Sequence, residues 1–264
     1  MEQSPGPFHL RRPGPPLSEF VDFFWIYEGY APLHSRERLL PTGTSELVFT
    51  RDVNRRAASA VAGPRSESMT LDTSTPFSVI AVHFKPGGAF PFFEVPGTEL
   101  RNRSETLDAV WGTYASSISD RLWEKDSAEC RFEVLQEAML ATARGRFERH
   151  AAVRYALDAF DRSNGAGPVA EVVQRLGLSP RRFSEVFRRE VGLSPKAFCR
   201  IRRFNEVLTR IERRTDVDWA DIALSCGYFD QAHFNHDFRA FAGLSPSAYL
   251  RERMSRTHVV VSSE

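Results

Sequence analysis

The sequence has few of the features that mark secreted, membrane-bound or disulfide-rich proteins. It contains three cysteines in 264 residues, far apart and without a Cys-x-x-Cys pair, which excludes a disulfide framework and a cysteine-based zinc finger. No apolar run approaches the ~18 residues that a membrane span requires. The first residues also lack the apolar stretch of a secretory signal. We therefore expect a soluble, cytoplasmic protein that does not associate with membranes.

The sequence also lacks an overall charge of one sign, since 35 Lys+Arg face 34 Asp+Glu for a net charge of +1. The distribution is uneven. Residues 165–256 hold 16 Lys+Arg and 11 Asp+Glu, a net of +5, which leaves −4 for the rest of the chain. A basic C-terminal third on an acidic body is typical of a protein in which one domain binds a polyanion. At ~100–200 residues per domain, the length accommodates two domains.

The N-terminal region is predicted to be rich in β-strands, because short runs of aromatic and β-branched residues alternate with turn formers. The clearest predicted strands are Phe20–Tyr27, Glu46–Thr50 and Ser78–Phe84. The first ~15 residues are rich in Pro and Gly and are predicted to form an irregular arm. Residues 63–75 are polar and are expected to be looped at their ends.

After Thr98 the apolar residues recur every three or four positions, which predicts helices. One amphipathic helix is expected from Leu107 through Leu122, and further helices over Glu129–His150 and Ala151–Arg162. Ser163–Pro168 is a strong break and the best domain boundary. The predicted organisation is a β-rich sensing or dimerisation domain with a trailing helix (1–126), a helical connector (127–164), an all-α domain (165–256) and a tail (257–264).

The C-terminal region contains an internal repeat. Ala170–Gly177 resembles Ala220–Gly227, one residue is then added, and Gly192–Pro195 matches Gly243–Pro246. Between these stretches, Phe183, Phe187 and Arg188 match Phe234, Phe238 and Arg239. Each copy is predicted to be a short helix, a glycine turn and a second helix, so that the repeat forms two helix-turn-helix units.

Capping residues and apolar spacing support this prediction. The expected N-caps are Ser179, Ser194, Asp230 and Ser245. The first helices are expected to bury Ala170, Val173 and Leu176 in copy one and Ala220, Ala223 and Cys226 in copy two. Between the copies, apolar residues at 4-3-4-3 spacing predict one joining helix: Ala197, Ile201, Phe204, Leu208 and Ile211.

With the phenylalanines buried, the second helix of each copy exposes polar side chains. These are Arg181, Arg182, Ser184, Glu185 and Arg188 in copy one, and Gln231, His233, Asn235, His236 and Arg239 in copy two. Such side chains on a projecting helix can enter the major groove of DNA and read base edges. A helical repeat whose polar face is only solvated is the structural alternative.

The stretch Gly227–Arg239 (GYFDQAHFNHDFR), followed by Gly243–Tyr249, resembles the signature of AraC-family transcription regulators, and the upstream copy stands at the spacing that the family uses. The resemblance covers residues 169–251. It implies that two recognition helices enter successive major-groove segments on one face of the duplex, about one helical turn (~34 Å) apart. Residues 39–49 and 82–88 resemble the β-rich, cupin-like domain that precedes this module in one branch of the family. The expected fold class is therefore α+β, a cupin-like N-terminal domain followed by an all-α domain with two helix-turn-helix motifs.

The resemblance also implies roles for individual residues. It assigns base contacts to Arg181, Ser184, Glu185, Gln231, His233, Asn235 and His236. It assigns phosphate contacts to Arg182, Arg188, Lys196, Arg200 and Arg239. His236 departs from the family pattern, because many relatives carry Arg there. The implied partner is double-stranded DNA, and a small-molecule effector, RNA polymerase and a second copy of the chain are candidates for further partners.

Two other functional classes stay open at this point. A cupin-like enzyme with a helical accessory domain would need convergent titratable groups, but His34 and His83 belong to no His-x-His pair and we expect neither a metal nor another cofactor. Cys130, Cys199 and Cys226 fit buried or incidental thiols better than nucleophiles, so no enzymatic activity is expected. A helical module that binds protein would expose an apolar stripe on the second helices, where Arg, Gln, Asn and His occur instead.

Overall fold

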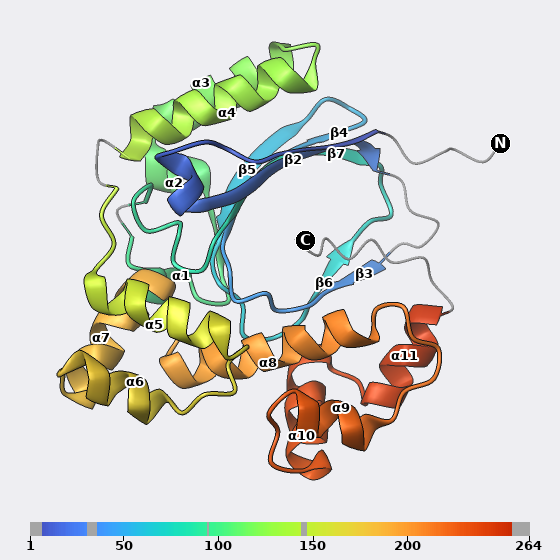
Figure 1. Ribbon diagram of the computed structural model, residues 1–264. Helices are drawn as coiled ribbons and strands as arrows, with labels where there is room; N and C mark the ends of the chain where they lie inside the picture. The colour runs from blue at the N-terminus through green and yellow to red at the C-terminus, as the bar shows by residue number, and fades with distance from the viewer. Residues whose placement is uncertain (1–6, 31–35, 94, 144–146, 255–264) are drawn as a thin grey trace.

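Two separate hydrophobic cores organise the chain in the computed structural model (Figure 1). The structure describes residues 7–30, 36–93, 95–143 and 147–254. One core lies between a β-sheet and helices in the N-terminal half, and the other lies within the helical C-terminal half. This arrangement confirms the predicted α+β class.

The N-terminal half is a sheet domain with short helices. Its strands are β1 (Phe8–Arg11), β2 (Val21–Tyr30), β3 (Arg36–Leu39), β4 (Glu46–Asp52), β5 (Ala57–Ala62), β6 (Met69–Asp72), β7 (Phe77–Phe84) and β8 (Ser104–Thr106). Its helices are the 3-10 turn η1 (Leu17–Glu19), α1 (Gly97–Leu100), α2 (Leu107–Trp111), α3 (Thr113–Glu124) and α4 (Ala128–Ala143). The main sheet has the strand order β1-β2-β7-β4-β5-β8, and β3 pairs separately with β6.

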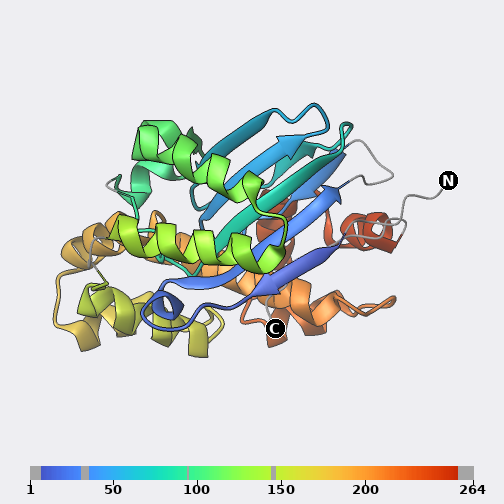
Figure 2. The same ribbon diagram turned by 90° about the horizontal axis from the view of Figure 1, so that it is seen from above.

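The strand register places one set of apolar side chains on a single face of the main sheet. Phe24 lies opposite Val82, Val82 lies opposite Leu47, and Phe49 lies opposite Ile80. All five side chains are buried, since alternate residues of a strand point to the same face. Helices α3 and α4 lie across this face (Figure 2). The other face carries half-buried residues such as Trp25 and Val48.

Several N-terminal predictions are wrong in detail. Phe8–Arg11 forms edge strand β1 by pairing with β2, in place of the irregular arm expected over the first 15 residues. The helix expected through Leu107–Leu122 breaks at Gly112, whose φ of +60° suits glycine. The helix expected over Glu129–His150 ends at Ala143, and His150 instead caps α5 by accepting a hydrogen bond from the Ala152 amide.

The C-terminal half is a bundle of short helices held by one long helix. Its helices are α5 (Ala151–Arg162), α6 (Val169–Leu176), α7 (Pro180–Val191), α8 (Pro195–Ile211), α9 (Trp219–Ser225), α10 (Gln231–Ala242) and α11 (Pro246–Met254). Helices α6 and α7 form the first helix-turn-helix unit, and α9 and α10 form the second. In Figure 1 both units lie on the side of the molecule opposite to α3 and α4.

Helix α8 packs against both units through aromatic rings. Near its start, the Phe198 ring lies 5.8 Å from that of Phe187 in α7. Further along, the Phe204 ring lies 5.2 Å from the rings of Phe238 and Phe241 in α10. These rings are almost fully buried, so α8 holds the two units through continuous apolar packing.

The predicted buried faces of α6 and α9 are confirmed at Val173, Leu176, Ala223 and Cys226 and are wrong at one position each. Ala170 and Ala220 are exposed, whereas Val172 and Ile222 are buried. The actual stripes have four members each: Val169, Val172, Val173 and Leu176 in α6, and Trp219, Ile222 and Ala223 in α9 with Cys226 at its C-cap. The spacing of three and four residues is retained, but it starts one position earlier.

The two helices of the predicted connector belong to different cores. Helix α4 contributes Phe132 and Leu135 to the N-terminal core, and α5 contributes Val153 and Phe160 to the C-terminal core. The predicted tail, 257–264, lies outside the described residues. Within the described ranges, no helix is both long and apolar enough to cross a membrane.

Phe234 provides a direct test of the second unit's packing. Its ring is fully buried and lies 5.3–5.9 Å from those of Tyr228, Phe238 and Trp219. We expect Phe234→Ala to lower the free energy of unfolding by about 3–5 kcal/mol, because it removes a large buried ring and leaves a cavity. Chemical denaturation measures this loss. Leu224→Ala, which truncates a side chain that is 65% exposed, is the control, and equal stability of the two variants would contradict the packing described here.

Candidate nucleic-acid interface

The second helices of the two units, α7 and α10, begin and end with matching local structures, and we call them the reading helices. The Ser179 hydroxyl accepts a hydrogen bond from the Arg182 amide at the start of α7, and the Asp230 carboxylate accepts one from the His233 amide at the start of α10. Gly192 and Gly243 end the two helices with φ values of +79° and +71°. Ser194 and Ser245 cap the helices that follow. All four predicted N-caps are confirmed.

The exposed side of α7 is strongly basic. Arg181, Arg182, Arg188 and Arg189 are exposed, and Ser184 lies half-buried among them. Arg182 forms an exposed ion pair of 3.2 Å with Glu185, so part of its charge is already matched. Arg189 is not among the residues predicted from the sequence. The signal was present, because the pair Arg188–Arg189 repeats the pair Arg181–Arg182 two turns further along the helix.

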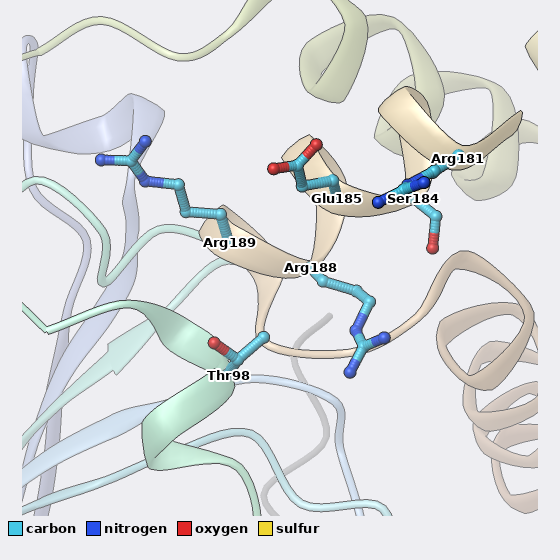
Figure 3. Close-up of a pocket in the computed structure, with 6 residues that line it drawn as sticks. All are labelled: Thr98, Arg181, Ser184, Glu185, Arg188 and Arg189. Atoms are coloured by element: carbon cyan, nitrogen blue, oxygen red, sulfur yellow. The ribbon is translucent and has the colours of Figure 1, made fainter. Parts of the chain in front are cut away.

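Several of these residues line a shallow pocket of about 430 Å³ beside α7: Arg181, Ser184, Glu185, Arg188 and Arg189, with Thr98 from the N-terminal domain. Figure 3 shows Arg181, Ser184 and Arg188 on one side of the helix and Glu185 and Arg189 on the other. Thr98 of α1 lies next to the C-terminal half of α7. The basic surface of α7 is therefore bordered by the sheet domain.

The exposed side of α10 is polar and less basic. Gln231, His236 and Arg239 are exposed, whereas His233 and Asn235 are half-buried. The His233 ring packs edge-on against Tyr228 at 5.3 Å, and this contact limits the directions in which it can point. The side chains predicted to contact bases thus occur together on each helix, some exposed and some half-buried.

Arg200 is engaged inside the protein. Its Nε and Nη2 atoms donate to both carboxylate oxygens of Asp237 at 2.7–3.1 Å, and these hydrogen bonds raise the pKa of the guanidinium. Asp237 lies on α10 and is 1% exposed, so this pair ties the second reading helix to α8. Of the other predicted phosphate contacts, Lys196, Arg188 and Arg239 are exposed.

The N-terminal domain contacts the C-terminal ends of both reading helices. The backbones of Gly97 and Gly192 lie so close that a Cβ on Gly97 would fall 2.8 Å from the Gly192 nitrogen. At the end of α10, the Arg38 guanidinium donates to the Ala242 carbonyl at 2.5 Å. A third contact joins the Asn205 amide of α8 to the Thr42 carbonyl at 3.3 Å. The sheet domain is therefore docked against both units at once.

Of the histidine and cysteine residues considered above for metal binding or catalysis, His83 is held by structural contacts, and Cys199 and Cys226 are buried. His83 forms hydrogen bonds with Glu46 and Thr44 and stacks on Phe23 at 4.7 Å, as expected for a structural histidine. His34 lies outside the described residues. In the part of the chain that the structure describes, no group of three or more His, Cys, Asp or Glu could hold a metal ion. Burial raises the pKa of the Cys199 thiol to about 12, and it also raises that of Cys226, so both thiols stay protonated near neutral pH.

Comparison with known proteins agrees with this geometry. Residues 172–252 match a family model described as a helix-turn-helix domain, and residues 9–106 match a domain of unknown function, DUF6597. The HTH-type transcriptional regulator Rv1931c of Mycobacterium tuberculosis is 33% identical over 34% of this chain and 34% of its own. The arabinose operon regulatory protein of Escherichia coli K12 is 30% identical over 31% of this chain and 27% of its own. Residues 172–252 form a helix-turn-helix domain of the AraC type.

The match spans only about a third of the length of these relatives. A solved structure, ToxT from Vibrio cholerae O395, is similar over 89% of this chain and 99% of its own, at 10% identity and a TM-score of 0.46. Both units of the AraC-type domain, α6–α7 and α9–α10, fall almost wholly within residues 172–252.

The ion pair between Arg200 and Asp237 generates a stability prediction for the AraC-type domain. Arg200→Ala leaves the buried Asp237 carboxylate with only a longer contact of 3.8 Å to the His233 imidazole, and we expect a loss of about 3–5 kcal/mol in the free energy of unfolding. Asp237→Ala should cost less, because Arg200 is 31% exposed and can turn toward water. The double variant should be more stable than the sum of both losses implies. Denaturation of the four proteins measures these values, and additive losses would contradict a direct coupling.

Proposed function

We propose that this protein is a sequence-specific, DNA-binding transcription regulator that reads two successive major-groove segments with α7 and α10. The observation that carries the proposal is the pair of matching helices with solvent-facing polar side chains, held on one shared helix. Arg182, Arg188 and Arg189 of α7, together with Lys196 and Arg239, would supply salt-dependent affinity through phosphates. The polar side chains in the first two turns of each helix would supply sequence choice.

The proposed base contacts are those that the sequence predicts: Arg181, Ser184, Glu185, Gln231, His233, Asn235 and His236. We propose phosphate contacts for Lys196, Arg182, Arg188, Arg239 and, in addition, Arg189. For Arg200 we propose a positioning role, because two of its nitrogens are already bonded to Asp237. We favour a regulator over an enzyme because the relatives with matching sequence are regulators and because His83 is held by structural contacts. A cytoplasmic location accords with this function.

We further propose that the N-terminal domain modulates access to DNA. Its support is the position of α1 beside the basic surface of α7 and the hydrogen bond from Arg38 to the end of α10. The half-buried face of the main sheet is the proposed site for an effector, since the indole nitrogen of Trp25 is buried there without a hydrogen-bond partner. Edge strand β1, with Phe8 43% and Leu10 46% exposed, is the proposed contact for a second copy.

Selection of bound fragments from random DNA tests the proposed function, and Arg181→Ala tests the assignment within it. On the selected site we expect this variant to lose about 1–3 kcal/mol of binding free energy, because a good arginine–base contact contributes that much. Binding to random DNA should change little. Arg213→Ala, which removes an equal charge from the α8–α9 loop, is the matched control. An equal loss on both DNAs would assign Arg181 to a phosphate, and failure to select any sequence would contradict the function.

Gly97→Ala tests modulation by the N-terminal domain. The added methyl group cannot fit against Gly192, so we expect α1 to move away from α7 and affinity for the selected site to rise severalfold. Gly14→Ala is the matched control, because a Cβ there meets no atom within 4 Å. Unchanged affinity in Gly97→Ala, with retained folding by circular dichroism, would contradict a restraint by α1.

A further inference from the structure

The turn of the second helix-turn-helix unit is one residue longer than that of the first. Between the turn glycine and the N-cap, the first unit has Leu178, whereas the second has Tyr228 and Phe229. Leu178 packs against the helical core. Tyr228 takes the same role, since it is 3% exposed and its ring lies 5.3 Å from that of Phe234. The additional residue of the second unit is therefore Phe229.

Phe229 does not pack against the protein. It is 87% exposed, which makes it the most exposed large apolar side chain in the part of the chain that the structure describes. A phenylalanine ring left in water forgoes the stabilisation that its burial would contribute. Trp219 is half-buried and the Tyr and Phe rings of this unit other than Phe229 are buried, so the local fold does not require an aromatic residue at this position.

The location of Phe229 indicates what would cover it. The residue directly precedes Asp230, whose carboxylate caps the His233 amide at 2.7 Å and thereby fixes the start of α10. Gln231 and Ala232, the first residues of α10, are also exposed. The N-terminal end of a helix-turn-helix reading helix is the end that contacts base edges. Phe229 is thus continuous with the polar surface that we propose meets DNA.

One group on the floor of the major groove suits a phenyl ring. Donors and acceptors of the bases require polar partners, whereas the C5-methyl group of thymine is apolar and is contacted by side chains such as phenylalanine. A ring at the tip of α10 could cover this methyl group and exclude water from both. The first unit has no side chain for such a contact at this position, because Leu178, the residue before its N-cap, packs against the helical core.

We propose that Phe229 is a specificity-determining residue that recognises the C5-methyl group of a thymine in the half-site read by α10. The inference rests on the proposed DNA-binding function. It adds an apolar contact to the second reading helix, which is less basic than the first. It also accounts for an exposed aromatic side chain at a position where the first unit has no residue.

The test measures binding of the full-length protein to the selected DNA site with thymine replaced by uracil. Each thymine is replaced in turn by deoxyuridine, which removes only the methyl group. We expect one or two replacements in the α10 half-site to weaken wild-type binding about fourfold each, the value of one buried methyl group. Phe229→Ala should bind the thymine site about tenfold or more weakly, because it loses the burial of a whole ring. It should no longer distinguish thymine from deoxyuridine at those positions.

Two further variants distinguish a thymine contact from a general effect of apolar surface. Phe229→Leu should keep part of the thymine preference, and Leu224→Ala, which truncates another exposed apolar residue of the same unit, should bind as the wild type does. Equal sensitivity of wild type and Phe229→Ala to deoxyuridine would overturn the inference. Unchanged DNA binding with lost transcription in Phe229→Ala would also overturn it and would indicate a protein partner. Failure of the wild type to select any sequence would overturn both this inference and the proposed function.

Discussion

The arrangement of the two reading helices depends on the apolar packing of α8. This helix contributes Phe198 to the first unit and Phe204 to the second, and both rings are buried among the phenylalanines of α7 and α10. Because protein interiors are packed as densely as organic crystals, neither unit can shift along α8 without opening a cavity. The distance and rotation between α7 and α10 are therefore set by the protein rather than by its partner.

Polar contacts complement this packing at the points where the reading helices need a fixed orientation. Arg200 joins α8 to the buried Asp237 of α10, and the docked N-terminal domain contacts the ends of both reading helices through Gly97 and Arg38. A change within the sheet domain can thus reach both helices through short contacts. The exposed side chains of α7 and α10 take no part in these contacts. The two units share a fold but expose different side chains, as Phe229 of the second unit shows.

Local features of the sequence predict the helical domain well. The N-caps Ser179 and Asp230, the glycine turns and the buried phenylalanines are each encoded within a few residues, and the repeat makes every one of them visible twice. One predicted buried position in each first helix is wrong, Ala170 and Ala220, because the apolar stripe starts one residue earlier. Strand β1 escapes prediction because its pattern is only half apolar and its stability comes from pairing with β2.

Long-range contacts could not be predicted from the sequence. Nothing near Arg200 in the sequence indicates an ion-pair partner, since Asp237 lies 37 positions away and meets it only in the folded protein. The hydrogen bond from Arg38 to the Ala242 carbonyl joins residues 204 positions apart and involves a backbone group, so no side-chain pattern indicates it. The exposure of Phe229 was likewise not predictable, because the sequence does not show which of the adjacent residues Tyr228 and Phe229 is buried in the core.

A spacing experiment tests the central claim most directly. If α8 holds α7 and α10 rigidly for successive major-groove segments, inserting five base pairs between the two protected segments of the selected site rotates one segment by about half a turn. Binding should then fall to the level of a single half-site, and a ten-base-pair insertion should not restore it fully, because the span of α8 is fixed. Full affinity for the five-base-pair insertion would contradict the account, since it would show that the two units bind independently.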